Sequence, residues 1–312
     1  MDKVKEKRVA ENPNIIKFIG VGYKGIDILN KIANNKKEYI GLATIDIKEN
    51  KINENIKENI VFTEEHFKGE SLQKEGFFKI TDAINKHKDN LYKLIKKERL
   101  VLMICDVCDL VAVHILIELG KIAKMNDTLV IPIIINTQKS NNINYKFFIK
   151  KINRCIGPSV IISNNKVFGN IKFTNDTIDD YYIIDSILNL FIENMIATCS
   201  VYIDYEDVEW LFNGNDNVEM SIIKVNEKSS EEDMRYKLIK NRICKGTYEL
   251  PKKIIINATA NKKYINYDKA FKIIQKVAQV IEAESDKDCK ITFSLKFTQE
   301  ENKSIEILTI KA

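Results

Sequence analysis

Apolar residues in the first half of the chain form short continuous runs, and between the runs they recur at helical spacing. Each run has the length of a buried strand rather than of a helix. Strands alternating with helices are typical of a parallel sheet with helices on both faces and right-handed crossovers. The strands predicted in this way are 14–19, 39–47, 100–105, 128–135 and 159–163, and the helices are 26–33, 77–99 and 110–125.

A long segment at 179–198 is apolar on most of its circumference, as expected of a buried helix between two domains. The pattern changes after it. Ser230–Asp233 has the form of a capping box, which predicts a helix from there to about Cys244. The remaining elements expected are a strand at 253–258, an amphipathic helix at 267–284, and an antiparallel pair of strands at 288–297 and 304–310.

These patterns predict an α/β protein with a Rossmann-like parallel-sheet domain, a central core helix and a smaller α/β domain. We expect a solvated, disordered tail before the first strand. The predicted boundaries are 1–13 for the tail, 14–178 for the first domain, 179–200 for the central helix and 201–312 for the second domain.

Composition excludes several classes of protein. The chain has 312 residues, 45% of them hydrophobic and 30% charged. No apolar run approaches the roughly 20 residues of a membrane span, so direct membrane insertion is not expected. The net charge is +5, and we see no compact basic stripe with aromatics that would predict nucleic-acid binding. Six dispersed cysteines without a secretory signal predict reduced thiols in the cytoplasm, and the single Cys105–Cys108 pair lacks the second pair of a zinc site.

The candidate chemistry begins with Gly20, Gly22 and Gly25, which lie between the first strand and the first helix. Glycines there let the backbone approach a phosphate, and the helix N-terminus adds free N–H groups. Asp46 ends the next strand, where an acid can hold a ribose hydroxyl. This spacing fits a dinucleotide-binding protein of the NAD type, although a plain strand-to-helix turn has the same pattern.

The order of motifs along the chain resembles the FtsZ/tubulin family from about residue 14 to residue 312. The first loop reads GVGYKGID, and Thr44–Asp46 matches the family's NTD ending of the second strand. Gly120–Lys124 resembles an IAK-like helix end, and Tyr202–Val208 resembles NxDFADV. No single motif is strong, but their order and spacing are specific to this family.

This resemblance implies a cytoskeletal or cell-division protein that binds GTP or GDP with magnesium, if its pocket is functional. Gly20, Gly22, Lys24, Gly25 and Asp46 would then contact the nucleotide. Asp185 on the central helix would read the base. Asp204 and Asp207 would act on the nucleotide of a neighbouring subunit, either another copy or a genuine FtsZ.

One loop departs from the family. Where the family has GGGTGTG around the phosphates, this chain has Cys108–His114 without any glycine. Asp106 and Asp109 lie beside the expected phosphate position, where a like charge at 4 Å costs about 4 kcal/mol. We therefore expect impaired GTP binding and hydrolysis, with co-assembly on or regulation of a filament as the function. An active GTP-hydrolysing polymer protein and an NAD-type protein stay open as alternatives.

Overall fold

The computed structural model is built from two compact units, Met1–Ser159 and Val160–Ala312. The tail at 1–13, most of the region expected to form the central helix, and Asp185 lie outside the described residues. Among the residues described, no helix is long and apolar enough to cross a bilayer. The structure describes residues 16–34, 40–62, 81–82, 84–96, 98–136, 145–163, 184, 201–214, 218–244, 246, 249–299 and 303–312.

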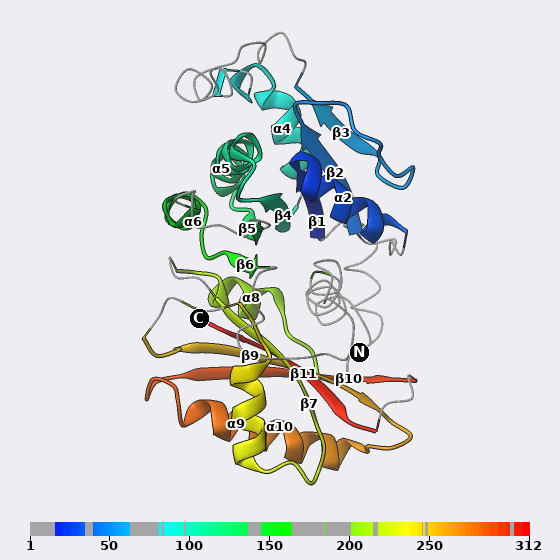
Figure 1. Ribbon diagram of the computed structural model, residues 1–312, viewed down its shortest axis with the longest axis vertical. Coiled ribbons are helices and arrows are strands. Elements are labelled where there is room, and N and C mark those ends of the chain that lie inside the picture. The colour runs from blue at the N-terminus through cyan, green and yellow to red at the C-terminus, as the bar shows by residue number, and fades with distance from the viewer. Residues whose placement is uncertain are drawn as a thin grey trace. The chain divides into compact units, whose positions relative to one another are not determined.

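The first sheet has six strands in the order β3-β2-β1-β4-β5-β6 (Figure 1). The pairings from β3 through β5 are all parallel, which confirms the parallel sheet predicted from the alternating pattern. The strand order reverses between β1 and β4, and in such sheets ligands bind beyond the carboxyl ends of the strands at this switch point. The strands are β1 Ile16–Val21, β2 Ile40–Asp46, β3 Glu58–Val61, β4 Leu100–Asp106, β5 Leu129–Asn136 and β6 Val160–Ser163.

Helices cover both faces of this sheet, because right-handed crossovers in opposite directions leave them on opposite sides. α2 connects β1 to β2 on one face, and α4, α5 and α6 lie on the other (Figure 1). The described part of the helix predicted at 77–99 ends at Ile95, earlier than expected. α6 was not predicted. The bounds are α2 Gly22–Ala33, α4 Lys88–Ile95, α5 Leu110–Lys124 and α6 Tyr145–Cys155.

The second sheet has five strands in the order β10-β9-β11-β7-β8. The last two strands fall where the sequence predicts them, but their predicted pairing was wrong, because β9 lies between them. β9 and β10 are parallel, joined by the amphipathic helix α10 as a crossover, and β11 runs antiparallel to β9 and β7. The strands are β7 Glu219–Val225, β8 Arg242–Cys244, β9 Lys253–Asn261, β10 Lys290–Thr298 and β11 Ile305–Lys311.

α9 and α10 pack on one face of the second sheet and enclose its hydrophobic core (Figure 1). Ser230 caps α9, its hydroxyl accepting from the Asp233 N–H at 3.1 Å, as the sequence predicts. The helix ends at Lys240, however, and Cys244 is the buried last residue of strand β8. Among the described residues of this unit, the helices are α8 Tyr205–Leu211, α9 Glu231–Lys240 and α10 Tyr267–Glu282.

Candidate functional site

The glycine loop joins β1 to α2 at the switch point of the first sheet. Gly22 opens α2 with φ +70°, a conformation that favours glycine. Gly20 and Gly25 have a packing role: a Cβ on Gly20 would lie 2.7 Å from the Gly25 carbonyl oxygen, and one on Gly25 would collide with the Ile104 carbonyl oxygen of β4. Two of the three fingerprint glycines are therefore required by helix–sheet packing, whether or not a ligand binds.

Asp109 occupies the position at the start of α5 where an anion would bind. It is the N-cap residue, and its Oδ1 accepts hydrogen bonds from the N–H groups of Val111 at 3.1 Å and Ala112 at 3.0 Å. Its Oδ2 lies 2.7 Å from where a Cβ on Gly22 would be. The free N–H groups of a helix N-terminus are what binds a phosphate in nucleotide sites. Here two of them already bind an internal carboxylate.

Two further carboxylates act on Asp109. Burial raises the pKa of Asp109 above its usual value, and the charges of Asp46 and Asp106 raise this pKa further against the opposing hydrogen bonds from Ala112 and Val111. The carboxyl ends of β2 and β4 thus place negative charge around the α5 N-terminus. A phosphate at this point would meet repulsion, and two of the N–H donors that it would need are already bound to Asp109.

Asp46 does not present an open carboxylate to a ribose. Its Oδ1 accepts from the Ile47 N–H at 2.6 Å and its Oδ2 accepts from the Asn50 side-chain amide at 2.7 Å. These bonds fix the turn that follows β2. The arrangement does not favour the hypothesis of an NAD-type protein, in which this acid binds the ribose of the dinucleotide.

A hollow of about 390 Å³ lies between the outer face of α2 and the loop after β2. Its asparagines hold the loop in place: the Asn30 amide donates to the Lys51 carbonyl at 2.8 Å, and the Asn53 amide donates to the Asn34 side chain at 2.7 Å. Tyr23 at its rim is 71% exposed. Lys24 is half-buried in the first turn of α2. The amides of Asn30 and Asn53 in this hollow therefore have a structural role.

Asp204 and Asp207 form a reciprocal capping box at the start of α8 in the second unit. Asp204 Oδ1 accepts from the Asp207 N–H at 2.9 Å, and Asp207 Oδ2 accepts from the Asp204 N–H at 3.4 Å. Burial raises the pKa of Asp207, and the neighbouring Asp204 charge raises it further. The sequence predicts the pair as a functional acid loop, and the geometry adds a structural role for both residues.

Both ends of α8 are tied to the second sheet. The Thr292 hydroxyl on β10 donates to Asp207 Oδ1 at 3.2 Å. At the other end, Lys253 Nζ on β9 donates to the carbonyls of Trp210 and Asn213. Lys253 and Lys290 also lie 5.3 Å and 4.9 Å from the Trp210 ring centroid. The acid loop is therefore held in place by strands far away in sequence.

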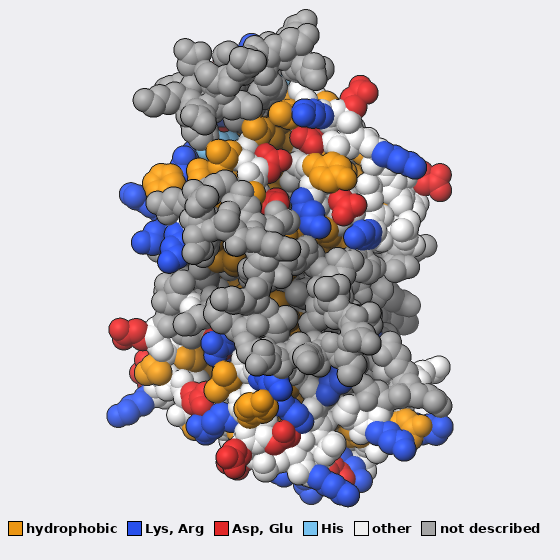
Figure 2. Space-filling model, in the orientation of Figure 1, with side chains coloured by type: hydrophobic (Ala, Val, Ile, Leu, Met, Phe, Trp, Pro, Cys, Tyr) orange, Lys and Arg blue, Asp and Glu red, His pale blue; other side chains and the backbone are white. Residues whose placement is uncertain are grey.

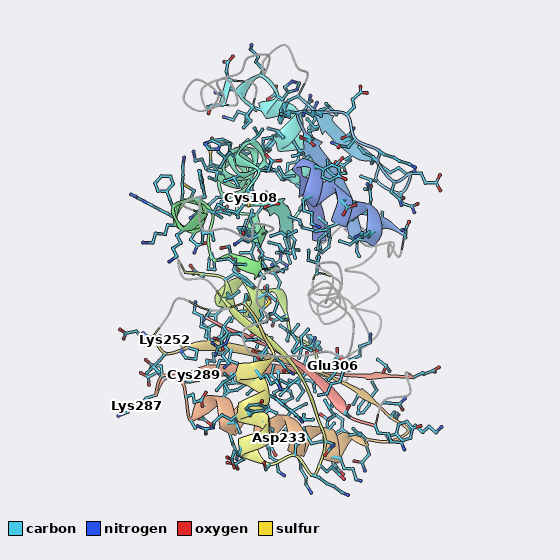
Figure 3. The ribbon with its side chains drawn as sticks, viewed as in Figure 1. Cys108, Asp233, Lys252, Lys287, Cys289 and Glu306 are labelled. Carbon is cyan, nitrogen blue, oxygen red and sulfur yellow. The ribbon has the colours of Figure 1, made fainter. Side chains whose placement is uncertain are left out.

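The cysteine pair at the end of β4 shows no metal site. Cys105 is buried, and the Cys108 thiol (Figure 3) lies 4.0 Å from the Asn136 side-chain oxygen. Burial raises the pKa of Cys105, as do the charges of Asp109 and Asp106, so this thiol is not a reactive thiolate. Within the described ranges, no group of three or more His, Cys, Asp or Glu side chains is placed to hold a metal.

Several residues that shape the two sites could not be identified from the sequence. Thr292 and Lys253 are 85 and 43 residues from their partners on α8, so no local pattern connects them. The capping role of Asp109 was detectable, because an aspartate before an apolar helical segment is a common N-cap. The structure brings Gly22, Asp46, Asp106 and Asp109 together in the first unit. It does not describe Asp185.

The whole chain superimposes on several solved structures of one fold family. An empty dimer of FtsZ from M. jannaschii matches with a TM-score of 0.74 and 12% identity over 99% of this chain and 91% of that one. CetZ from Methanosaeta thermophila matches with a TM-score of 0.66 and 12% identity, covering 95% and 86%. TubZ from Clostridium botulinum phage c-st matches with a TM-score of 0.62 and 10% identity, covering 96% and 92%.

No protein-family model matches the sequence, and no curated protein matches it. The similarity is therefore one of fold, and it confirms the FtsZ/tubulin-like architecture expected from the order of the motifs.

Proposed function

We propose that this protein of FtsZ/tubulin-like fold is a filament-associated protein that binds and hydrolyses GTP poorly and acts on a filament built by active subunits. The supporting observation is Asp109, whose carboxylate accepts two hydrogen bonds from the α5 N-terminus at the switch point of the sheet. The internal carboxylate takes the place that a nucleotide phosphate would need.

Binding of a phosphate at the α5 N-terminus would have two energetic costs. A phosphate would have to displace Asp109 from its two N–H donors, and the displaced charge would still lie close to Gly22. Asp46 and Asp106 add negative charge nearby. One unit like charge at 4 Å costs about 4 kcal/mol at an effective dielectric near 20, which corresponds to roughly a thousandfold in affinity.

The acid loop supplies the proposed link to a filament. The resemblance to the FtsZ/tubulin family implies that Asp204 and Asp207 act on the nucleotide of the adjacent subunit. The capping box and the bond from Thr292 hold both carboxylates in a fixed arrangement, as a contact that works in trans requires. A chain with this loop and a blocked phosphate site would join or cap a filament through one face. It would promote hydrolysis only in the subunit that it touches.

Calorimetry with GTP, GDP, ATP and NAD, each with magnesium, tests the nucleotide part. We expect no micromolar binding by the wild-type protein. Asp109→Ser keeps a capping side chain but removes the charge, and should raise the affinity for GTP measurably. Asp268→Ser, an exposed first-turn carboxylate of α10, changes the net charge equally and should have no effect. Micromolar GTP affinity in the wild type contradicts the proposal.

Two observations favour an active GTPase as the second candidate. Gly22 retains the positive φ of a phosphate-loop glycine, and the raised pKa of Asp207 suits a group that accepts a proton from water. In that case the chain would polymerise with its own copies. Phosphate release that requires magnesium and rises steeply with protein concentration distinguishes this candidate.

A further inference from the structure

Helix α6 has an exposed face of unusual composition. The helix contains no acidic residue, and its cations are Lys146, Lys150, Lys151 and Arg154. At 3.6 residues per turn these four side chains fall within about 140° of arc. Phe147 lies within the same arc and is 59% exposed. This face is not evident as a compact basic stripe in the sequence, because apolar residues of the buried side separate the cations along the chain.

The opposite side of α6 fixes its orientation. Ile149, Ile152 and Ile156 are buried, and Ile156 packs so tightly on α5 that a Cβ on Gly120 would lie 2.5 Å from its Cδ1 atom. The buried Asn153 side chain accepts from the Ser159 hydroxyl at 2.7 Å. The basic face therefore points away from α5 and toward solvent. Figure 2 shows blue side chains around orange ones at the left edge, where α6 lies in Figure 1.

The cations of this face are not neutralised by the described part of the chain. None of the four forms an ion pair with a carboxylate there, and on neighbouring α5 Glu118 pairs with Lys121 at 2.6 Å. Burial lowers the pKa of His114 on α5, and the positive charges of Lys151 and Lys121 lower it further. Among the described residues, the face of α6 therefore carries an excess of positive charge.

We infer that α6 is a membrane-surface element, which adsorbs to bilayers rich in anionic phospholipids through its four cations and the exposed Phe147. The apolar side of α6 packs inside the protein, so its basic face would meet the membrane: clustered Lys and Arg side chains are attracted to an anionic leaflet, and aromatic rings are favoured at the level of the headgroups. The cations meet the lipid phosphates, and the ring enters the boundary of the acyl chains. An acidic protein surface would complement the four cations but would also need an apolar pocket for the Phe147 ring. The inference does not rest on the nucleotide site.

Adsorption through one short helix is weak and depends on salt. It becomes effective when many copies are linked, because linkage converts each further contact into an intramolecular one. The helix does not span the bilayer. The face would hold an assembly of this protein, or a filament carrying it, against an anionic membrane.

Vesicle flotation tests the inference. Wild-type protein should float with vesicles of phosphatidylcholine and phosphatidylglycerol in equal parts at low salt, and not with phosphatidylcholine alone. Lys150→Glu with Arg154→Glu should weaken this binding by about twentyfold or more. The matched control is Lys272→Glu with Lys276→Glu, an exposed pair at the same spacing on α10, which should change it less than about twofold.

A fluorescence measurement distinguishes insertion of the residue-147 ring into the bilayer from electrostatic attraction alone. Phe147→Trp in a Trp210→Phe background leaves one tryptophan on α6, and its emission should shift to the blue with anionic vesicles only. The inference is wrong if wild-type protein fails to float with anionic vesicles, or if the α10 pair weakens flotation as much as the α6 pair. It is also wrong if an acidic polypeptide or a nucleic acid binds α6 and anionic vesicles do not.

Discussion

At Gly25, helix α2 and strand β4 come so close that the α-carbon has room for hydrogen only. A methyl group there would collide with the Ile104 carbonyl oxygen, which is backbone and cannot rotate away. Gly25→Ala should therefore lower the free energy of unfolding by about 3 kcal/mol, measured by urea denaturation. Gly214→Ala is the control, because nothing lies within 4 Å of its Cβ position, and it should change stability by less than about 0.5 kcal/mol.

Asp109 should make stability depend on pH in a definite direction. Because burial raises its pKa above the ordinary 3.8, the folded protein holds this proton more tightly than the unfolded chain. The protonated Asp109 side chain therefore stabilises the folded state relative to the charged one. This stabilisation is fully present below pH 3.8 and is lost as the pH rises through the pKa of the folded state. Asp109→Asn keeps a capping side chain without the charge.

Compared with the wild type, Asp109→Asn should therefore become relatively more stable as the pH rises from about 4 to about 7. Denaturant unfolding of both proteins across this range measures the difference. Parallel curves for the two proteins would show that the carboxylate is not strained by its surroundings.

At the scale of elements, α8 illustrates how a short helix is held by its two ends. It has seven residues, too few to be stable alone, and depends on the Asp204–Asp207 box at one end and Lys253 at the other. Lys253→Met removes two hydrogen bonds to the last carbonyls, so it should destabilise the protein by about 1–2 kcal/mol. Trp210 is the sole tryptophan, and its fluorescence reports on this helix alone.

The emission of Trp210 should move to the red in Lys253→Met, because the last turn of α8 loosens and water reaches the ring. Lys290→Met is the matched control, since Lys290 contacts the ring at 4.9 Å and supplies no bond to the helix end. Lys290→Met should lower the free energy of unfolding by about 0.5 kcal/mol at most. Equal shifts in the two variants would mean that the ring contacts, and not the carbonyl bonds, hold the helix.

At the scale of the whole molecule, the proposed function predicts an asymmetry in assembly, because the protein would have the acid loop but not a working phosphate site. Head-to-tail contacts build open filaments, and a subunit that lacks one of the two faces stops growth. We expect substoichiometric amounts of this protein to shorten filaments of an active FtsZ, measured by light scattering and sedimentation. The rate of GTP hydrolysis by each FtsZ subunit that contacts this protein should rise.

Asp204→Asn with Asp207→Asn removes both charges and retains the hydrogen-bond acceptors of the capping box, so it should abolish the effect on turnover while the fold persists. Asp204→Ala with Asp207→Ala would lose the cap as well. If the wild-type protein neither sediments with filaments nor alters their length or turnover, co-assembly is ruled out.

The sequence by itself determined most of the first sheet, because buried parallel strands leave apolar runs and the amphipathic crossovers leave a helical period. It also placed the glycine loop, Asp46 and Asp109 at one edge, since carboxyl ends of parallel strands meet there. The order of short motifs was enough to predict the architecture that the solved structures confirm.

Only the tertiary structure decided the rest, because the deciding contacts are distant in sequence. The order of the second sheet depends on β9 lying between β10 and β11, which no local pattern specifies. The bond from Thr292 to Asp207 joins residues 85 apart. That Asp109 fills the α5 N-terminus, and that the cations of α6 share one face, required the side chains to be placed in space.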